Sequence, residues 1–285
     1  MYTATITQAS IRLEQPTHPE IRYLQTGDSG PIVMFIHGWG AFKEIWWMAL
    51  CDLGRDHRCF ALDLPGHGGS PPGLADTITG LADAIATYCD QLGLREIILF
   101  GHSMGGSVAV ELALRRPDLL RQLFLVDAAV DSLRMPGFTR IYLLHGIGWP
   151  ALRLSQSLSR LLGPLARQVP HTHGGGWLRP WLRRISYLSH HDPANLYRLL
   201  RSLFAPRDAE RLTRITTPTV VLSGQFDLLV PPRLSRRLAR RISGARYAAI
   251  GAAVHNPMDE RPRAFCRVVR ALLAEPRVAI SGGEK

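Results

Sequence analysis

The stretch Gly101-His102-Ser103-Met104-Gly105 carries a pattern that could support nucleophilic chemistry, a serine flanked at fixed spacing by glycines. Four apolar residues, Ile97-Ile98-Leu99-Phe100, precede it and predict a buried parallel strand, while residues 107–115 have helical spacing. A sharp turn between strand and helix lifts the serine hydroxyl clear of the sheet, and the glycines let the two elements approach closely. The spacing therefore predicts a nucleophile elbow with Ser103 as the attacking group.

A serine hydroxyl needs a general base, and that base needs a carboxylate to orient it. Asp227 follows a buried strand and precedes two prolines, and His255 lies just beyond the last expected strand. These residues follow Ser103 along the chain and are our candidates for the acid and the base. Asp127 and Asp131, which follow the strand before, remain alternative sources of the carboxylate.

The elements expected to position these groups alternate between strand and helix, which predicts a doubly wound, mostly parallel α/β sheet. Function in such sheets sits at the carboxyl ends of the strands, where the loops carry Trp39, Ser103, Asp127, Asp227 and His255. The expected strands are one or two edge strands within 12–25, then 31–36, 58–63, 97–100, 122–127, 219–222 and 246–250, and the expected helices cover 41–50, 77–92, 107–115, 233–241 and 262–273.

The alternation stops after residue 131, and residues 132–210 contain leucine-rich amphipathic pieces broken by prolines. We predict a core domain from residues 1–131 and 211–285, and a helical insertion from residues 132–210, here called the cap. The cap follows the fifth strand of the expected parallel series and would lie over the same edge of the sheet as the candidate site. We expect its leucines to face an acyl pocket and its arginines to face water.

The chain of 285 residues has a formal net charge of +11, concentrated in the cap region. Residues 140–215 hold twelve arginines against three acidic residues. No nucleic-acid-binding motif accompanies this charge, so we expect a solvated basic face or a contact with an acidic protein or anionic lipid surface. The arginines that suggest such a face include Arg153, Arg160, Arg179, Arg183, Arg184, Arg198 and Arg201.

Four scattered cysteines have no metal-ligand spacing and suggest a reducing compartment without a disulfide framework. The first residues have neither a basic segment nor an apolar segment of the signal-peptide kind, and no apolar run reaches the roughly 20 residues of a membrane span. We therefore expect a cytoplasmic protein, with peripheral membrane association as an option that the basic cap leaves open.

Several motifs together resemble the α/β-hydrolase superfamily, in which the order of the triad along the chain is serine, acid, histidine. They are His37-Gly38-Trp39-Gly40, Asp63-Leu64-Pro65-Gly66-His67-Gly68, Gly101-His102-Ser103-Met104-Gly105-Gly106, Gly224-Gln225-Phe226-Asp227 and His255-Asn256-Pro257-Met258-Asp259-Glu260-Arg261-Pro262.

The resemblance implies an α/β-hydrolase fold in which Ser103 is the nucleophile, Asp227 the acid and His255 the base. It also implies an oxyanion hole made by the backbone N–H groups of Trp39 and Met104, with no cofactor and no metal.

Within the superfamily, two stretches look most similar to carboxylesterases of the pimeloyl-carrier-protein methyl-ester esterase type: His37-Gly38-Trp39-Gly40 and Ala252-Ala253-Val254-His255-Asn256-Pro257. That resemblance implies hydrolysis of a carboxylic ester whose acyl group lies in an apolar pocket under the cap. Hydrolysis of a thioester, a lactone or a carbon–carbon bond on the same triad remains the alternative. A binding protein without catalysis is disfavoured because every member of the triad is present.

Overall fold

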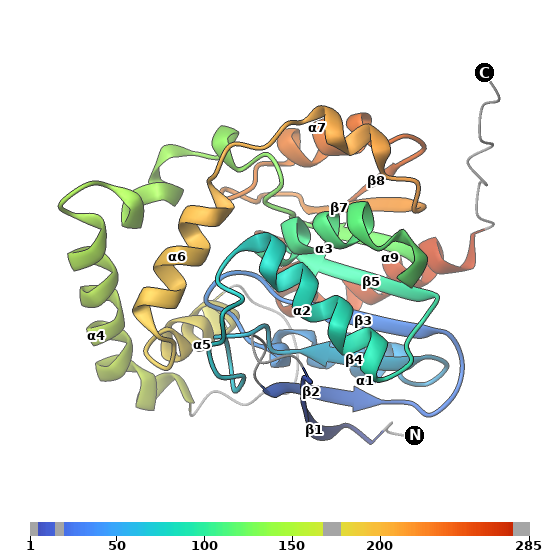
Figure 1. The fold of residues 1–285 in the computed structure, drawn as a ribbon, viewed down its shortest axis with the longest axis horizontal. Helices are drawn as coiled ribbons and strands as arrows, with labels where there is room; N and C mark the ends of the chain where they lie inside the picture. Colours follow the sequence, from blue (N-terminus) through green and yellow to red (C-terminus); the bar gives the residue numbers. More distant parts are fainter. Residues whose placement is uncertain (1–4, 15–19, 168–177, 276–285) are drawn as a thin grey trace.

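Six strands run parallel through one sheet, and two antiparallel strands complete an edge, in the order β1-β2-β4-β3-β5-β6-β7-β8 (Figure 1). The computed structural model describes residues 5–14, 20–167 and 178–275. The predicted doubly wound, mostly parallel sheet is confirmed. The strands are β1 (Thr7–Arg12), β2 (Glu20–Thr26), β3 (Ile32–Ile36), β4 (Arg58–Leu62), β5 (Ile97–His102), β6 (Leu120–Val126), β7 (Thr219–Gly224) and β8 (Arg246–Ile250).

The strand that precedes the cap, β6, is the fourth of the parallel series and the sixth of the chain. The expected count was five because the N-terminal segment was counted with the parallel series. That segment forms β1 and β2 at the edge of the sheet, as predicted; they pair antiparallel with each other, and β2 pairs antiparallel with β4. The parallel series therefore starts at β3.

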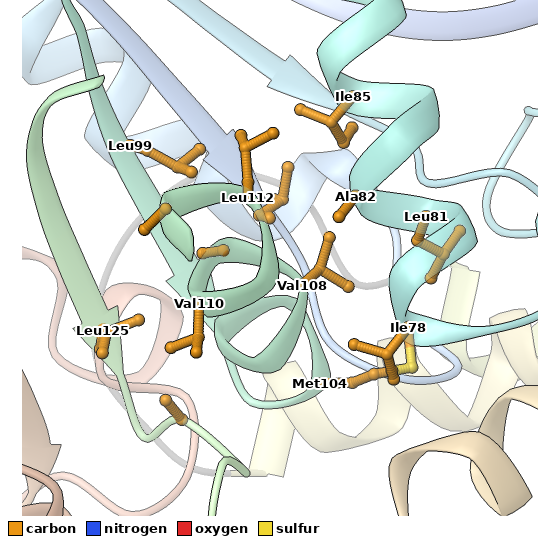
Figure 2. Close-up of a cluster of buried hydrophobic side chains, with 14 of the residues drawn as sticks. Ile78, Leu81, Ala82, Ile85, Leu99, Met104, Val108, Val110, Leu112 and Leu125 are labelled. Atoms are coloured by element: carbon orange, nitrogen blue, oxygen red, sulfur yellow. The ribbon is translucent and has the colours of Figure 1, made fainter. Parts of the chain in front are cut away.

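Two hydrophobic cores lie on opposite faces of the sheet, because neighbouring strand residues point to opposite sides. Leu99 belongs to the core under α2, α3 and α7, whereas Phe100 belongs to the core under α1 and α9. Figure 2 shows the first core, in which Met104 and Val108 of α3 point toward α2. The helices around the sheet are η1 (Lys43–Trp46), α1 (Trp47–Leu53), α2 (Ile78–Gln91), α3 (Met104–Arg115), η2 (Pro117–Leu119), α7 (Pro232–Arg241), α8 (Pro257–Glu260) and α9 (Pro262–Ala274), where η marks a 3-10 helix.

The described residues between β6 and β7 form helices and connecting loops, with no strand. Several prolines expected to break helices stand in a first turn instead, where a missing N–H costs no hydrogen bond; Pro193, for example, is the first residue of α6. Pro164 lies within α4. The cap helices are η3 (Ser132–Arg134), η4 (Gly137–Leu143), α4 (Gly148–Arg167), α5 (Leu178–Leu188), α6 (Pro193–Leu203) and η5 (Glu210–Arg214).

The expected orientation of the cap side chains is wrong in part. Leu154, Leu158 and Leu161 are exposed, whereas Arg183 is buried and Arg184 is only partly exposed. Arg153, Arg160, Arg198 and Arg201 face water as expected, and the side chain of Arg179 lies outside the described residues. No helix in the described part of the chain is long and apolar enough to cross a membrane.

Candidate active site

The turn between β5 and α3 holds Ser103 in a backbone conformation that few side chains adopt, with φ 54° and ψ −118°. Its N–H donates to the carbonyl of Val126 at 3.0 Å, and its own carbonyl accepts from Gly106 and Ala129. Strain of this kind is typical of functional turns. Gly105 is required for close approach, because a Cβ there would lie 2.4 Å from the carbonyl oxygen of His37.

A continuous chain of hydrogen bonds joins the three residues proposed from the sequence as a triad. Ser103 Oγ lies 3.1 Å from His255 Nε2, and His255 Nδ1 lies 2.7 Å from Asp227 Oδ2. The other carboxylate oxygen of Asp227 accepts from the N–H groups of Leu229 and Val230, at 2.8 and 3.0 Å. This arrangement can move a proton from the hydroxyl to the imidazole while the carboxylate holds the ring.

The two alternative acids occupy different surroundings. Asp127 is fully buried beside Asp227 and accepts from the N–H of Gly224 at 2.9 Å. Asp131 pairs with Arg134 and Arg237, at 3.3 and 3.2 Å. Of these carboxylates, Asp227 is the one that contacts His255.

Asp127 and Asp227 have opposite pKa shifts although they lie side by side. Burial, the charge of Asp227 and a hydrogen bond with it raise the pKa of Asp127 well above its usual value. Burial raises the pKa of Asp227 too, but the charge of His255 and hydrogen bonds from His255, Asp127 and Val230 outweigh burial and lower it. Asp127 therefore serves as a neutral acid that donates to an ionised Asp227.

The loop after β3 lies against the elbow, since a Cβ on Gly38 would come within 2.8 Å of Ser103 Cβ. The next residue, Trp39, donates its indole N–H to the carbonyl of Leu196 in the cap at 2.8 Å. Met104 is the first residue of α3, whose first N–H groups have no acceptor within the helix and carry the positive end of its dipole. The backbone N–H groups expected to form an oxyanion hole thus belong to two segments packed around Ser103.

Two further residues hold the segment that carries His255, and sequence reasoning missed their role. His102 is fully buried, and its Nε2 lies 2.7 Å from the backbone carbonyl of His255. Burial lowers the pKa of His102 well below its usual value, so the ring is neutral and donates one N–H to that carbonyl. Glu260 accepts from the N–H groups of Val254 and Asn256, at 2.6 and 3.0 Å. The position of Glu260 in the motif that starts at His255 was the signal that the sequence offered for this role.

Two arginines of α5 reach the same segment from the cap. Arg183 pairs with Asp259, and Arg184 donates to the side chain of Asn256 and to the carbonyl of Trp39. Burial lowers the pKa of the Arg184 guanidinium although the carboxylates of Asp259, Glu260 and Asp227 favour its charge. The sequence offered no local signal for these two contacts, because the residues that they join lie 76 and 72 positions apart.

Three buried histidines form a second contact between core and cap. The ring of His67 lies 5.3 Å from that of His37 and 5.2 Å from that of His191, which belongs to the cap. Burial lowers the pKa of His37 to about 3 and lowers the pKa of the other two. The neutral rings accept backbone hydrogen bonds, from Leu64 to His37 Nε2 at 3.1 Å and from Gly68 to His191 Nε2 at 3.2 Å.

Comparison with known proteins gives a consistent family match. The family model described as alpha/beta hydrolase fold matches residues 31–262. A relative from Pseudomonas savastanoi pv. phaseolicola that carries the name carbamate hydrolase RutD is 30% identical over 267 residues, which cover 88% of this chain and 96% of that protein. A protein of Nitrosomonas europaea named pimeloyl-[acyl-carrier protein] methyl ester esterase is 26% identical over 258 residues, with 88% and 98% covered.

A solved structure, described as a hydrolase from Pseudomonas aeruginosa, superposes with a TM-score of 0.75 at 22% identity. It covers 94% of this chain and 99% of the other. At this identity, the match reports on the fold alone.

Proposed function

Because this chain belongs to the α/β-hydrolase fold family, as its motifs predict, we propose that it is a serine hydrolase that cleaves carboxylic esters through an acyl-enzyme. The observation that carries the proposal is the hydrogen-bonded chain from Ser103 through His255 to Asp227. Ser103 is only partly buried and lies at a strained elbow, which supports the proposal as well.

In this mechanism His255 Nε2 takes the proton of Ser103 as Oγ attacks the ester carbonyl. Asp227 keeps Nδ1 protonated and stabilises the imidazolium that forms. The backbone N–H groups of Trp39 and Met104 donate to the oxyanion of the tetrahedral intermediate, an interaction whose loss typically costs about 3–4 kcal/mol of barrier. The imidazolium then gives its proton to the departing alcohol, and a water molecule repeats the sequence on the acyl-enzyme to release the acid.

The choice of ester as the substrate class is supported by the name of the Nitrosomonas europaea relative, a methyl ester esterase. Thioester, lactone and carbon–carbon bond hydrolysis use the same triad and compete with it. We further propose that the basic cap contacts an anionic partner, since Arg153, Arg160 and Arg201 are exposed. The four unpaired cysteines support a cytoplasmic location.

The nucleophile is tested by Ser103→Ala, which removes the attacking oxygen. We expect kcat for a water-soluble p-nitrophenyl ester to fall by a factor on the order of 10⁴–10⁶, with the circular dichroism spectrum unchanged. Ser107→Ala is the matched control, because Ser107 lies one turn further along α3 and its hydroxyl donates to the carbonyl of Ala129 at 2.9 Å. More than a tenth of wild-type activity in Ser103→Ala would refute the mechanism.

The substrate class is tested by comparing the wild-type kcat/KM for matched ester, thioester and lactone substrates of equal acyl length. A preference for the ester supports the proposal. If kcat/KM for the thioester or the lactone were at least ~100-fold higher than for the ester, the ester would be rejected as the substrate class, and the triad mechanism would stand.

A further inference from the structure

The helix α4 exposes most of its leucines to water and buries two of its polar side chains against the protein. Leu152, Gln156 and Ser159 form its buried stripe. Gln156 donates to the carbonyls of Leu188 and His191, and Ser159 Oγ accepts from the N–H of Ser189. The exposed side carries Leu154, Leu158, Leu161 and Leu162 at the spacing of one helical face. Water therefore meets a leucine face that a helix of a globular domain would normally bury.

The segment before α4, residues 133–147, adds to the exposed apolar surface of the cap. Large apolar side chains there are also exposed, and α4 lies at the outer edge of the cap, away from the sheet (Figure 1). Exposed apolar patches of this extent mark interaction surfaces. We call Leu154, Leu158, Leu161 and Leu162 the apolar face of the cap; the exposed apolar side chains before α4 are Leu133, Phe138, Ile141, Leu144 and Ile147.

The sequence around α4 carries charge of one sign. Residues 132–191 contain eight arginines and no aspartate or glutamate. Arg153 and Arg160 of α4 are exposed, on the flank of the helix between the leucines and the buried stripe. An amphipathic helix with exposed leucines on one face and arginines beside them is the arrangement that binds in the interface of an anionic bilayer.

Two other occupants fit less well. A second copy of this chain in a two-fold dimer would bring the same arginines together across the contact, with no acidic residue in residues 132–191 to neutralise them. An acidic carrier protein would neutralise the arginines but would leave the row of exposed leucines without an apolar counterpart. A bilayer offers hydrocarbon and phosphate at the same surface.

We propose that the apolar face of the cap docks on an anionic lipid surface, with the leucines of α4 at the acyl boundary and Arg153 and Arg160 among the headgroup phosphates. The proposal specifies a lipid surface as the anionic partner of the basic cap, and it rests on that part of the proposed function. The docking is independent of the role of Ser103, because none of the residues of the apolar face belongs to the triad.

The experiment measures flotation of the wild-type protein with phosphatidylcholine vesicles, with and without phosphatidylglycerol. We expect binding to the anionic vesicles that is at least ~10-fold tighter than to neutral ones and that weakens with added salt. Hydrolysis of a water-soluble ester without vesicles is measured separately, so a failure of docking and a failure of the serine mechanism give different results.

The apolar contact is tested by Leu161→Asp, matched by Leu74→Asp on the loop between β4 and α2. Leu161 is 72% exposed and Leu74 is 73% exposed, so each variant introduces one negative charge at a leucine of nearly the same exposure. We expect Leu161→Asp to weaken vesicle binding about tenfold or more and Leu74→Asp to leave it unchanged.

The charge contact is tested by the double variant Arg153→Gln, Arg160→Gln against Arg233→Gln, Arg240→Gln on α7. All four side chains are exposed. We expect a loss of roughly tenfold in the first pair alone. Equal effects in both pairs, self-association without vesicle binding, or saturable binding to an acyl carrier protein without vesicle binding would each overturn the proposal.

Discussion

Two carboxyl groups share one buried position next to His255, and their unequal protonation explains how both can be tolerated there. Two ionised carboxylates in contact would repel each other strongly in a dry site. A neutral Asp127 removes that repulsion and supplies a hydrogen bond to Asp227. The proton on Asp127 thus helps to keep the negative charge on the carboxylate that faces the imidazole.

The pair is tested by two single amide substitutions. Asp227→Asn should lower kcat on the order of 10⁴-fold, as in the serine-protease triad, because an amide favours the wrong imidazole tautomer. Asp127→Asn should keep most of the activity, because its amide can still accept from Gly224 and donate to Asp227. Steady-state kinetics on one soluble ester compares them directly. An inactive Asp127→Asn with an active Asp227→Asn would assign the acid to the loop after β6.

At the residue scale, the sequence pointed to the side chains that lie in recognisable local patterns. Ser103, Asp227 and His255 each follow an apolar run that reads as a strand, and all three lie in contact. Their catalytic roles stay predictions. The contacts of His102, Asp127 and Arg184 were not predictable. Their hydrogen-bond partners lie 72 to 153 positions away in the sequence, so the pairings depend on tertiary packing and leave no local pattern.

Among the elements, β5 and α3 meet at a junction with no room for a further side chain. A Cβ on Gly105 would meet the carbonyl of His37 at 2.4 Å, which is backbone that cannot move aside without shifting the loop after β3. The junction therefore couples the position of the nucleophile to the position of the loop that carries Trp39.

We expect Gly105→Ala to reduce kcat at least ~100-fold and to lower the melting temperature, because both segments must separate. Gly137→Ala is the matched control, since its Cβ would meet nothing within 4 Å. Kinetics and thermal denaturation of the two variants measure the difference. Equal behaviour would mean that the elbow can relax without disturbing the loop.

The strands and the helices of the core were predictable because their apolar residues follow the periodicity of buried parallel strands and of helix faces. The sequence overestimated the disruption by prolines in the cap, where Pro193 begins a helix. It also predicted that the leucines of α4 face a pocket, whereas Leu154, Leu158 and Leu161 are exposed. The periodicity of leucines identifies an apolar face but does not tell which neighbour covers it.

For the whole molecule, the histidines at the junction of core and cap link stability to pH. His37, His67 and His191 have lowered pKa values in the folded chain, mainly through burial. The unfolded chain binds protons at these rings from about pH 6.5 downward, while the folded chain binds fewer at the same pH. The free energy of unfolding therefore falls as the pH decreases below this value.

His191→Gln tests this linkage while keeping an acceptor near Gly68. Between pH 7 and pH 5, its free energy of unfolding should fall less steeply than that of the wild type, by up to about 1.4 kcal/mol per pH unit. Urea denaturation at several pH values measures the slope. His145→Gln, at an exposed position of the cap, should keep the wild-type slope. An unchanged slope in His191→Gln would show that His191 titrates equally in both states.

The contacts of α5 with the segment after His255 bear on how caps can be exchanged between related enzymes. Arg183 and Arg184 bind Asp259 and Asn256, which belong to the core segment and not to the cap. A chimera that receives a foreign cap at residues 132–210 would leave Asp259 buried without its cation, within four residues of His255. Transplanting a cap is thus a transplant of two separate stretches of sequence, the cap and the segment that follows His255.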